Sequence, residues 1–136
     1  MPNRPDLAIR CLDALTTPNK GRVKVVREAL SAGLLNDPKF AVPLVGALSD
    51  RSGVFADTLA DEILPEVGVT LLDPLRDGFD ELPEPVRFRH LRVIHGLAPE
   101  VAKECARRSA RAKHVMLSIE CLKILAGSER DAALLV

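Results

Sequence analysis

The chain has 136 residues, a length that suits one domain able to bury a substantial core. Hydrophobic residues make up 47% and charged residues 28% of it, a balance that excludes a disordered or membrane-spanning class. The 19 basic and 19 acidic side chains cancel, and Trp and Tyr are missing, so neither net charge nor the usual stacking side chains point to nucleic acid.

Apolar residues recur at three- and four-residue intervals along almost the whole chain, and no stretch alternates over the length of a strand. The sequence therefore predicts an all-α fold. Pro, Gly and Asp divide it into eight short helices, with starts at Asp37-Pro38 and Ala98-Pro99 and ends at Gly33, Gly68 and Gly127. The expected ranges, in chain order, are 5–16, 21–33, 38–49, 53–66, 69–79, 84–97, 99–109 and 112–126.

The predicted helices repeat with a period of about 30 residues, which is typical of helix pairs that bury their apolar faces only against neighbouring pairs. Pro43 and Pro74 stand 31 residues apart inside two predicted first helices, each followed by a matching apolar pattern. Both are expected in the helix interior, bent toward the outer, convex side. The second helices contain an apolar series predicted to form one buried seam: Leu30, Ile63, Ile94 and Leu122.

Residues 37–68 resemble a HEAT repeat, through Pro43 in the first helix, the Asp-containing turn at 49–53 and a second helix that ends at Gly68. Residues 69–98 follow the same pattern. A proline in a helix interior costs about 3 kcal/mol, so its recurrence at one repeat position is a specific feature. The family's Arg early in the second helix is matched by Arg87, with no match at 55–57.

The resemblance implies a right-handed α-solenoid of about four helix pairs, a single HEAT-like domain over 1–136. The repeats would be approximately 5–34, 37–68, 69–98 and 99–127, with 128–136 the start of a further helix or a tail. Such a protein is expected to act as an interaction or scaffolding module that binds a partner protein, of unknown identity, on the concave face of its second helices.

Charge is segregated along the chain. Residues 37–84 contain three basic and eleven acidic side chains (−8), and residues 86–114 contain eight and two (+6). Stacked repeats are expected to pair these charges with each other. The alternative is a nucleic-acid-binding protein that uses the basic block for phosphates. The block lies within 87–113 and consists of Arg87, Arg89, Arg92, Lys103, Arg107, Arg108, Arg111 and Lys113.

One charged residue stands two positions before each seam residue: Glu28, Asp61, Arg92 and Glu120. If the repeats stack in register, Arg92 lies between two carboxylates and forms a ladder across the second helices; alternatively it is free and binds a partner together with Arg89. The candidate partner-binding surface consists of Asp57, Asp61, Arg89, Arg92 and Lys113.

The sequence contains no phosphate-binding, nucleophile-elbow or dinucleotide motif, so no enzyme activity, catalytic residue or cofactor is predicted. His90 and His95 are five residues apart, which does not suit a shared helical metal site, and His114 stands alone, so no metal ligands are predicted. Cys11, Cys105 and Cys121 are expected as reduced, buried thiols. With no signal-peptide pattern and no span long enough for a bilayer, a cytoplasmic location without membrane contact is expected.

Overall fold

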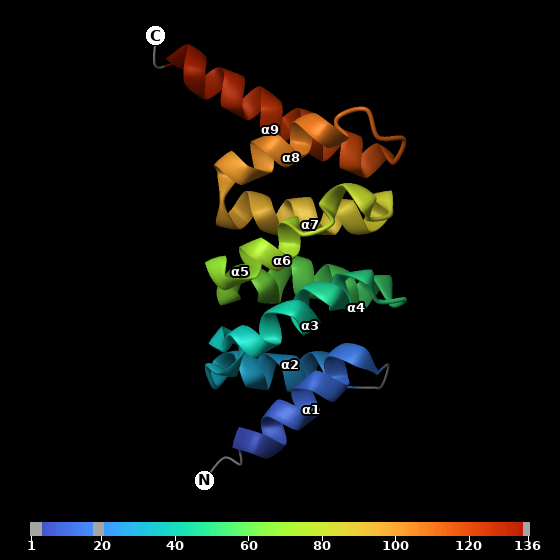
Figure 1. The fold of residues 1–136 in the computed structure, drawn as a ribbon, viewed down its shortest axis with the longest axis vertical. Coiled ribbons are helices and arrows are strands. Elements are labelled where there is room, and N and C mark those ends of the chain that lie inside the picture. The colour runs from blue at the N-terminus through green and yellow to red at the C-terminus, as the bar shows by residue number, and fades with distance from the viewer. Residues whose placement is uncertain (1–3, 18–20, 135–136) are drawn as a thin grey trace.

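The computed structural model describes residues 4–17 and 21–134, and the side chains of residues 7–17 and 21–126. Every regular element in these ranges is helical, so the prediction of an all-α fold is confirmed (Figure 1). The α-helices are α1 (Arg4–Thr16), α2 (Arg22–Ser31), α3 (Ala41–Gly46), α4 (Gly53–Thr58), α5 (Leu64–Val67), α6 (Leu72–Arg76), α7 (Glu84–Leu97), α8 (Pro99–Ser109) and α9 (Val115–Leu134). Short 3₁₀ helices are η1 (Leu34–Asn36), η2 (Pro38–Phe40), η3 (Ala47–Ser49), η5 (Val69–Leu71) and η6 (Phe79–Glu81), and η4 (Leu59–Ile63) is a π-helix.

The helices follow one another along the long axis of the molecule, with α1 and α9 at opposite ends (Figure 1). The expected first helices become α1, α3 with its flanking 3₁₀ turns, α6 and α8. The second helices become α2, the continuous segment α4–η4–α5, α7 and α9. First helices contact the next first helix, as α1 does with α3 and α3 with α6, and α7 packs on α5, α8 and α9. Contacts therefore join elements that are near in sequence.

Pro43 and Pro74 occupy equivalent places. Each is the third residue of a short α-helix, α3 or α6, that directly follows a 3₁₀ turn, and neither lies in a loop. The first four N–H groups of an α-helix have no partner within it, so a proline there removes no backbone hydrogen bond. The expectation of a proline in the interior of one bent helix is thus wrong, because each first helix is divided into a 3₁₀ turn and a new α-helix with the proline in its first turn; the matching helical positions of the two prolines are confirmed.

The π-helix η4 also precedes a proline, Pro65, the second residue of α5. Pro65 has no N–H to donate to the carbonyl of Asp61, four residues earlier, and its ring would crowd that carbonyl in an α-helix. The wider π turn relieves this contact without ending the helix. The second helix of this pair therefore runs from Gly53 to Val67 with one local bulge.

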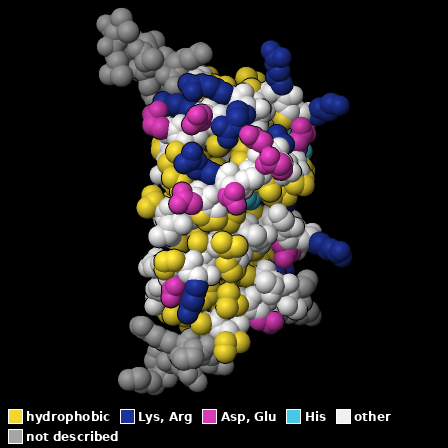
Figure 2. Space-filling model, viewed as in Figure 1, with side chains coloured by type: hydrophobic (Ala, Val, Ile, Leu, Met, Phe, Trp, Pro, Cys, Tyr) yellow, Lys and Arg dark blue, Asp and Glu magenta, His cyan; other side chains and the backbone are white. Residues whose placement is uncertain are grey.

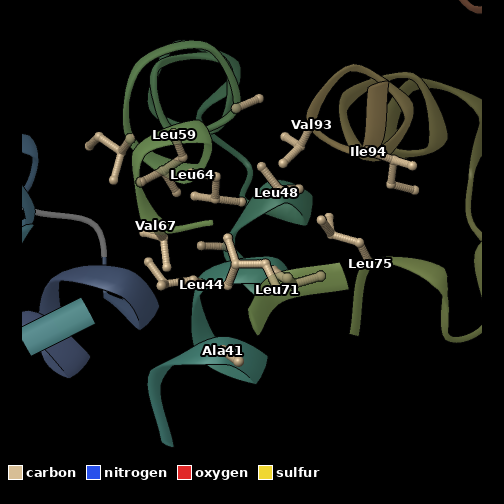
Figure 3. Packing of buried hydrophobic residues seen from close by; sticks show 14 of the residues in the cluster. Ala41, Leu44, Leu48, Leu59, Leu64, Val67, Leu71, Leu75, Val93 and Ile94 are labelled. Carbon is tan, nitrogen blue, oxygen red and sulfur yellow. The ribbon is translucent and has the colours of Figure 1, made fainter. Parts of the chain in front are cut away.

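The core lies between the two rows of helices, where Leu44, Leu48, Leu71 and Leu75 from the first helices meet Leu59, Leu64 and Ile94 from the second (Figure 3). Ile63 and Ile94 are fully buried, as predicted, and Leu30 is partly buried against the core. The prediction for Leu122 is wrong, because its side chain is 57% exposed. In α9 the buried positions are Leu117, Cys121 and Ile124, so Cys121 takes the seam position.

The last helix is longer than expected. Gly127 was predicted to end it, but α9 continues to Leu134. Residues 128–134, expected as a tail or as the start of a further helix, belong to α9, and residues 135–136 lie outside the described range. A glycine in a helix interior costs only about 1 kcal/mol relative to alanine, so a helix end at that position was not forced.

Candidate partner-binding surface

Four of the five predicted surface residues lie together on neighbouring second helices. Asp57 is on α4 and Asp61 on η4, and each pairs with an arginine of α7. The Nε of Arg89 lies 2.9 Å from Oδ1 of Asp57, and Nη2 of Arg92 lies 3.0 Å from Oδ1 of Asp61. Arg89 Nη1 also donates to the carbonyl oxygen of Leu48, at 3.0 Å. The acidic and basic blocks therefore meet across a helix–helix contact.

Lys113, the fifth residue, does not belong to this cluster. It lies in the turn between α8 and α9, where its backbone N–H donates to Oε1 of Glu84 at 3.1 Å. The same carboxylate accepts the backbone N–H of His114, through Oε2, at 2.9 Å. Within residues 7–17 and 21–126, no hydrogen bond or ion pair joins Lys113 to the other four. Glu84 thus fixes the turn backbone, which leaves the Lys113 side chain exposed at a separate place.

The predicted ladder forms on one side of Arg92 only. Its guanidinium pairs with Asp61 and lies 5.6 Å from the ring of Phe88, whereas the structure gives no Arg92–Glu120 ion pair among the described side chains. The prediction of a second carboxylate at Glu120 is therefore wrong. That prediction assumed that Leu122 faces the core. Because α9 buries Cys121 instead, the helix is rotated by about one residue relative to the expectation, and Glu120 does not face Arg92.

In the other direction, no ion pair among the described residues joins Glu28 directly to the helix that contains Asp61, and the contacts use Glu62, Arg27 and Arg10, which the predicted ladder did not include. Glu62, next to Asp61, pairs with Arg27 of α2 at 2.9 Å, and Arg10 of α1 lies 3.9 Å from Glu28 of α2. Adjacent carboxylates of η4 thus bind arginines from the helices on either side. The signal was present in the sequence as two consecutive acidic residues, followed three residues later by Pro65.

These cross-helix pairs have modest energies, because their side chains are about half exposed; Arg92 is 44% and Asp61 39% exposed. We predict that Arg92→Ala lowers the free energy of unfolding by about 0.2–1 kcal/mol and that Asp61→Ala does the same. In a double-mutant cycle measured by urea unfolding, the second substitution should cost less once the first is made. Additive effects would contradict the pairing, and Arg107→Ala, an exposed residue of α8, is the control.

Most of the basic block is engaged within the molecule. Arg108 pairs with Asp80 at 3.0 Å, and Lys103 with Glu100 at 3.0 Å. Arg87 donates to the carbonyl oxygens of Asp80 and Leu82 at 3.1 and 3.0 Å. With Arg89 and Arg92, five of the eight basic side chains have acceptors. In the described part of the chain the structure gives no side-chain hydrogen bond or ion pair to the remaining three: Arg107, Arg111 and Lys113.

A buried ion pair at the start of α2 was not predicted. Arg22 is only 6% exposed, and its Nη1 and Nη2 donate to the two carboxylate oxygens of Asp50 at 3.2 and 2.8 Å. Its Nε donates to the carbonyl oxygen of Ala14 at 2.9 Å, and its guanidinium carbon lies 3.6 Å from the ring centre of Phe55. This one side chain therefore connects α1, the turn after η3, and α4.

Arg22 and Arg87 act alike in their repeats. Arg22 is the first residue of α2 and Arg87 the fourth of α7, and each donates to a backbone carbonyl at the end of the preceding first helix or in the turn after it. Each also reaches the end of the next first helix, where Arg22 meets Asp50 and Arg87 Nη1 donates to Oγ of Ser109 at 3.3 Å. An arginine at this position of two second helices was the sequence signal that could have found the Arg22–Asp50 pair.

The histidines have structural contacts. His90 is buried, and its Nδ1 lies 3.1 Å from the carbonyl oxygen of Leu75, which holds α7 against α6. His114 accepts the backbone N–H of Leu117 at 3.2 Å and so caps the start of α9. In the described ranges, no three His, Cys, Asp or Glu side chains lie close enough together to form a metal site. The three cysteines are free and buried, as expected, and burial raises the pKa of Cys11 to about 11.

Burial lowers the pKa of His90 below its ordinary 6.5, while the hydrogen bond to Leu75 opposes that shift. The unfolded chain therefore binds a proton more readily than the folded one, and the contribution of His90 to stability, complete above pH 6.5, is lost as pH falls below that value. We predict a decline in the free energy of unfolding from pH 7 toward pH 5 that is flatter in His90→Asn. His95→Asn, on the exposed face of α7, should keep the wild-type slope; an equal slope in all three proteins would contradict the prediction.

No described helix has both the length and the apolar character needed to cross a bilayer. No protein-family model, curated protein or solved structure matches this chain.

Proposed function

We propose that this chain is a HEAT-like α-solenoid of about four helix pairs and that it works as a protein-interaction module. Its partner would bind on the surface formed by the second helices α2, α4–η4–α5 and α7. The repeated architecture is supported by the sequential stacking of the helices, by the matching places of Pro43 and Pro74, and by the matching contacts of Arg22 and Arg87.

The observation that carries this proposal is the row of ion pairs across these helices: Arg27–Glu62 and Asp61–Arg92, which are about half exposed, and Asp57–Arg89, in which the carboxylate is exposed and the arginine is mostly buried. Each guanidinium retains N–H donors, and each carboxylate retains lone pairs, that a partner can use. The pairs hold groups of both signs in defined positions before the partner arrives, which reduces the entropy lost on binding. A surface that carries both positive and negative charges suits a partner polypeptide that also carries charges of both signs.

The second candidate, binding of nucleic acid, has weaker support. Phosphate contacts by the whole basic block would require Arg89, Arg92 and Arg108 to leave carboxylates at about 3 Å. The specific observation in its favour is the group of Arg107, Arg111 and Lys113 at the end of α8 and in the following turn, all exposed. With three cations, the affinity for nucleic acid would fall only weakly as the salt concentration rises, much less than in a protein that contacts many phosphates.

A charge exchange tests the protein-binding proposal without removing the ion pair. Asp61→Arg combined with Arg92→Asp keeps a pair across η4 and α7 but reverses the pattern that a partner meets. The matched control is Glu100→Lys combined with Lys103→Glu, which reverses an ion pair on α8, outside the proposed surface. Partners captured from extracts of the native cells on the immobilised full chain would be identified by mass spectrometry and then purified for affinity measurement.

We expect the purified partner to bind the control variant as it binds the original chain and to bind the Asp61–Arg92 exchange at least ten-fold more weakly, about 1.4 kcal/mol. Equal affinity for both variants would overturn the proposed surface. Retention of duplex or single-stranded oligonucleotides in a gel-shift assay at low salt, lost at high salt and in an Arg107→Ala, Arg111→Ala, Lys113→Ala variant, would favour the second candidate instead.

A further inference from the structure

Two adjoining hollows open on the side of the molecule where α3 meets α6. The smaller has a volume of about 220 Å³ and the larger about 610 Å³, and they share Val42, Pro74 and Asp77 in their walls. Both lie away from the second-helix ion pairs described above. Figure 2 shows acidic and basic side chains gathered in the upper half of its face, with a small area of histidine surface beside acidic side chains near the middle.

His90 lies in the wall of the smaller hollow and is the most buried polar group there, with 3% of its surface exposed. Its Nδ1 faces the carbonyl oxygen of Leu75, which can only accept, so Nδ1 carries the proton of the neutral ring. Nε2, on the other edge of the ring, is then a hydrogen-bond acceptor. The structure gives no hydrogen bond between Nε2 and any described residue, and Nε2 is not among the fully buried atoms that lack a partner, so we take this acceptor as open to a ligand in the hollow.

The other polar groups of the smaller hollow are Asp77 and Ser49. Asp77 is exposed and is the only charged side chain in its wall, and in the described part of the chain it forms no ion pair. Besides Asp77, the charged groups in the wall of the larger hollow are Asp73, Arg76 and Arg108, and Arg108 is held by Asp80 at 3.0 Å. Among the described residues, Asp77 is therefore the charged group that lines the smaller hollow itself.

Apolar side chains form the remaining walls: Val42, Val45, Pro74 and Leu82. Val42 is 71% exposed, so a ligand that covers it would remove apolar surface from water. An acceptor-rich end beside an aliphatic wall fits a ligand with a cationic N–H head and a short aliphatic stem, because the head satisfies the acceptors while the stem removes apolar surface from water.

We propose that the smaller hollow binds a primary alkylammonium group, whose N–H donors reach Nε2 of His90 and the carboxylate of Asp77 while its stem lies against Val42 and Pro74. The group could belong to a free small amine or to a lysine side chain of another protein, which present the same chemistry. This inference is independent of the second-helix surface, since it uses residues of α3, α6 and the buried side of α7.

The test uses the full chain near neutral pH and n-butylammonium as the probe. Titration should shift the imidazole ¹⁵Nε2 resonance of His90 saturably, with a dissociation constant of about 1–10 mM, as expected for so few heavy atoms. The resonances of His95, exposed on the same helix, serve as an internal reference. A second probe, n-butyltrimethylammonium, has the charge and the stem but no N–H, and it should leave Nε2 unshifted.

Asp77→Asn should weaken n-butylammonium binding at least ten-fold, whereas Asp73→Asn, which changes a wall of the larger hollow only, should leave it unchanged. The peptide acetyl-Gly-Lys-Gly-amide distinguishes the two sources: tighter binding than n-butylammonium indicates a protein lysine, and no binding beside a saturable n-butylammonium shift indicates a small amine. The proposal is overturned if n-butylammonium gives no saturable shift up to about 100 mM, or if Asp77→Asn and Asp73→Asn bind it equally.

Discussion

Replacing Ile63 or Ile94 with alanine is expected to lower the free energy of unfolding by about 2–5 kcal/mol. Both side chains are fully buried in the common core of the first and second helices. Truncation removes three carbon atoms from a closely packed region that can close the cavity only in part, because each second helix is held by neighbours on both sides. Urea or thermal unfolding, followed by far-ultraviolet circular dichroism, measures the change.

Leu122→Ala is the matched control, because Leu122 holds the same place in the apolar series of the sequence but is 57% exposed. It should change the free energy of unfolding by no more than about 0.5 kcal/mol. The difference between the isoleucine variants and Leu122→Ala shows whether stability depends on burial in the structure or only on a place in the apolar repeat of the sequence. An unchanged melting temperature for Ile94→Ala, or a loss for Leu122→Ala as large as that for Ile63→Ala, would contradict the packing described here.

The all-α class and the approximate places of most helices were predictable from the sequence, because periodic apolar residues and proline or glycine punctuation are local signals; the end of α9 and the division of the first helices into short turns were not. The positions of Ile63 and Ile94 followed from the same periodicity. The error at Leu122 arose because spacing fixes a helical face only to within one residue, and a small Cys121 can fill the buried position that a leucine was expected to occupy. The displaced register also explains why Glu120 does not meet Arg92.

The candidate surface was predictable where opposite charges recur at the repeat spacing, as with Asp61 and Arg92. It was not predictable where backbone geometry decides the direction of a side chain. Consecutive residues of a helix point about 100° apart, so Asp61 and Glu62, neighbours in sequence, reach α7 and α2 respectively, and which helix lies on each side is decided by the packing. Lys113 was grouped with the others by charge alone, whereas its place in the α8–α9 turn is set by the contacts of Glu84 with the backbone.

The Arg22–Asp50 pair depends on a tertiary contact between residues 28 positions apart, and its only signal in the sequence is the arginine early in two second helices, Arg22 and Arg87. Its burial makes it the most consequential ion pair in the described structure, since Arg22 and Asp50 side chains are only 7% and 10% exposed. Burial acts to raise the pKa of Asp50, but hydrogen bonds from Arg22 and from the backbone of Ser52, together with the charge of Arg22, lower it below its ordinary 3.8. The carboxylate is therefore stabilised in the folded state.

Arg22→Ala should lower the free energy of unfolding by about 3–5 kcal/mol, because it leaves the Asp50 carboxylate buried without its partner and uncovers the ring of Phe55. Asp50→Ala should cost a similar amount, and the double substitution clearly less than the sum, as unfolding in urea can measure. Arg10→Ala, which removes an exposed partner of Glu28 at 3.9 Å, should cost no more than about 1 kcal/mol. Equal costs for Arg22→Ala and Arg10→Ala would show that this pair does not hold the first two helix pairs together.

The same pair makes stability depend on pH in acid. Since the pKa of Asp50 is lowered on folding, its contribution to the free energy of unfolding is complete above pH 3.8 and is lost as the pH falls below that value. Asp50→Ala should therefore reduce the loss of stability in acid.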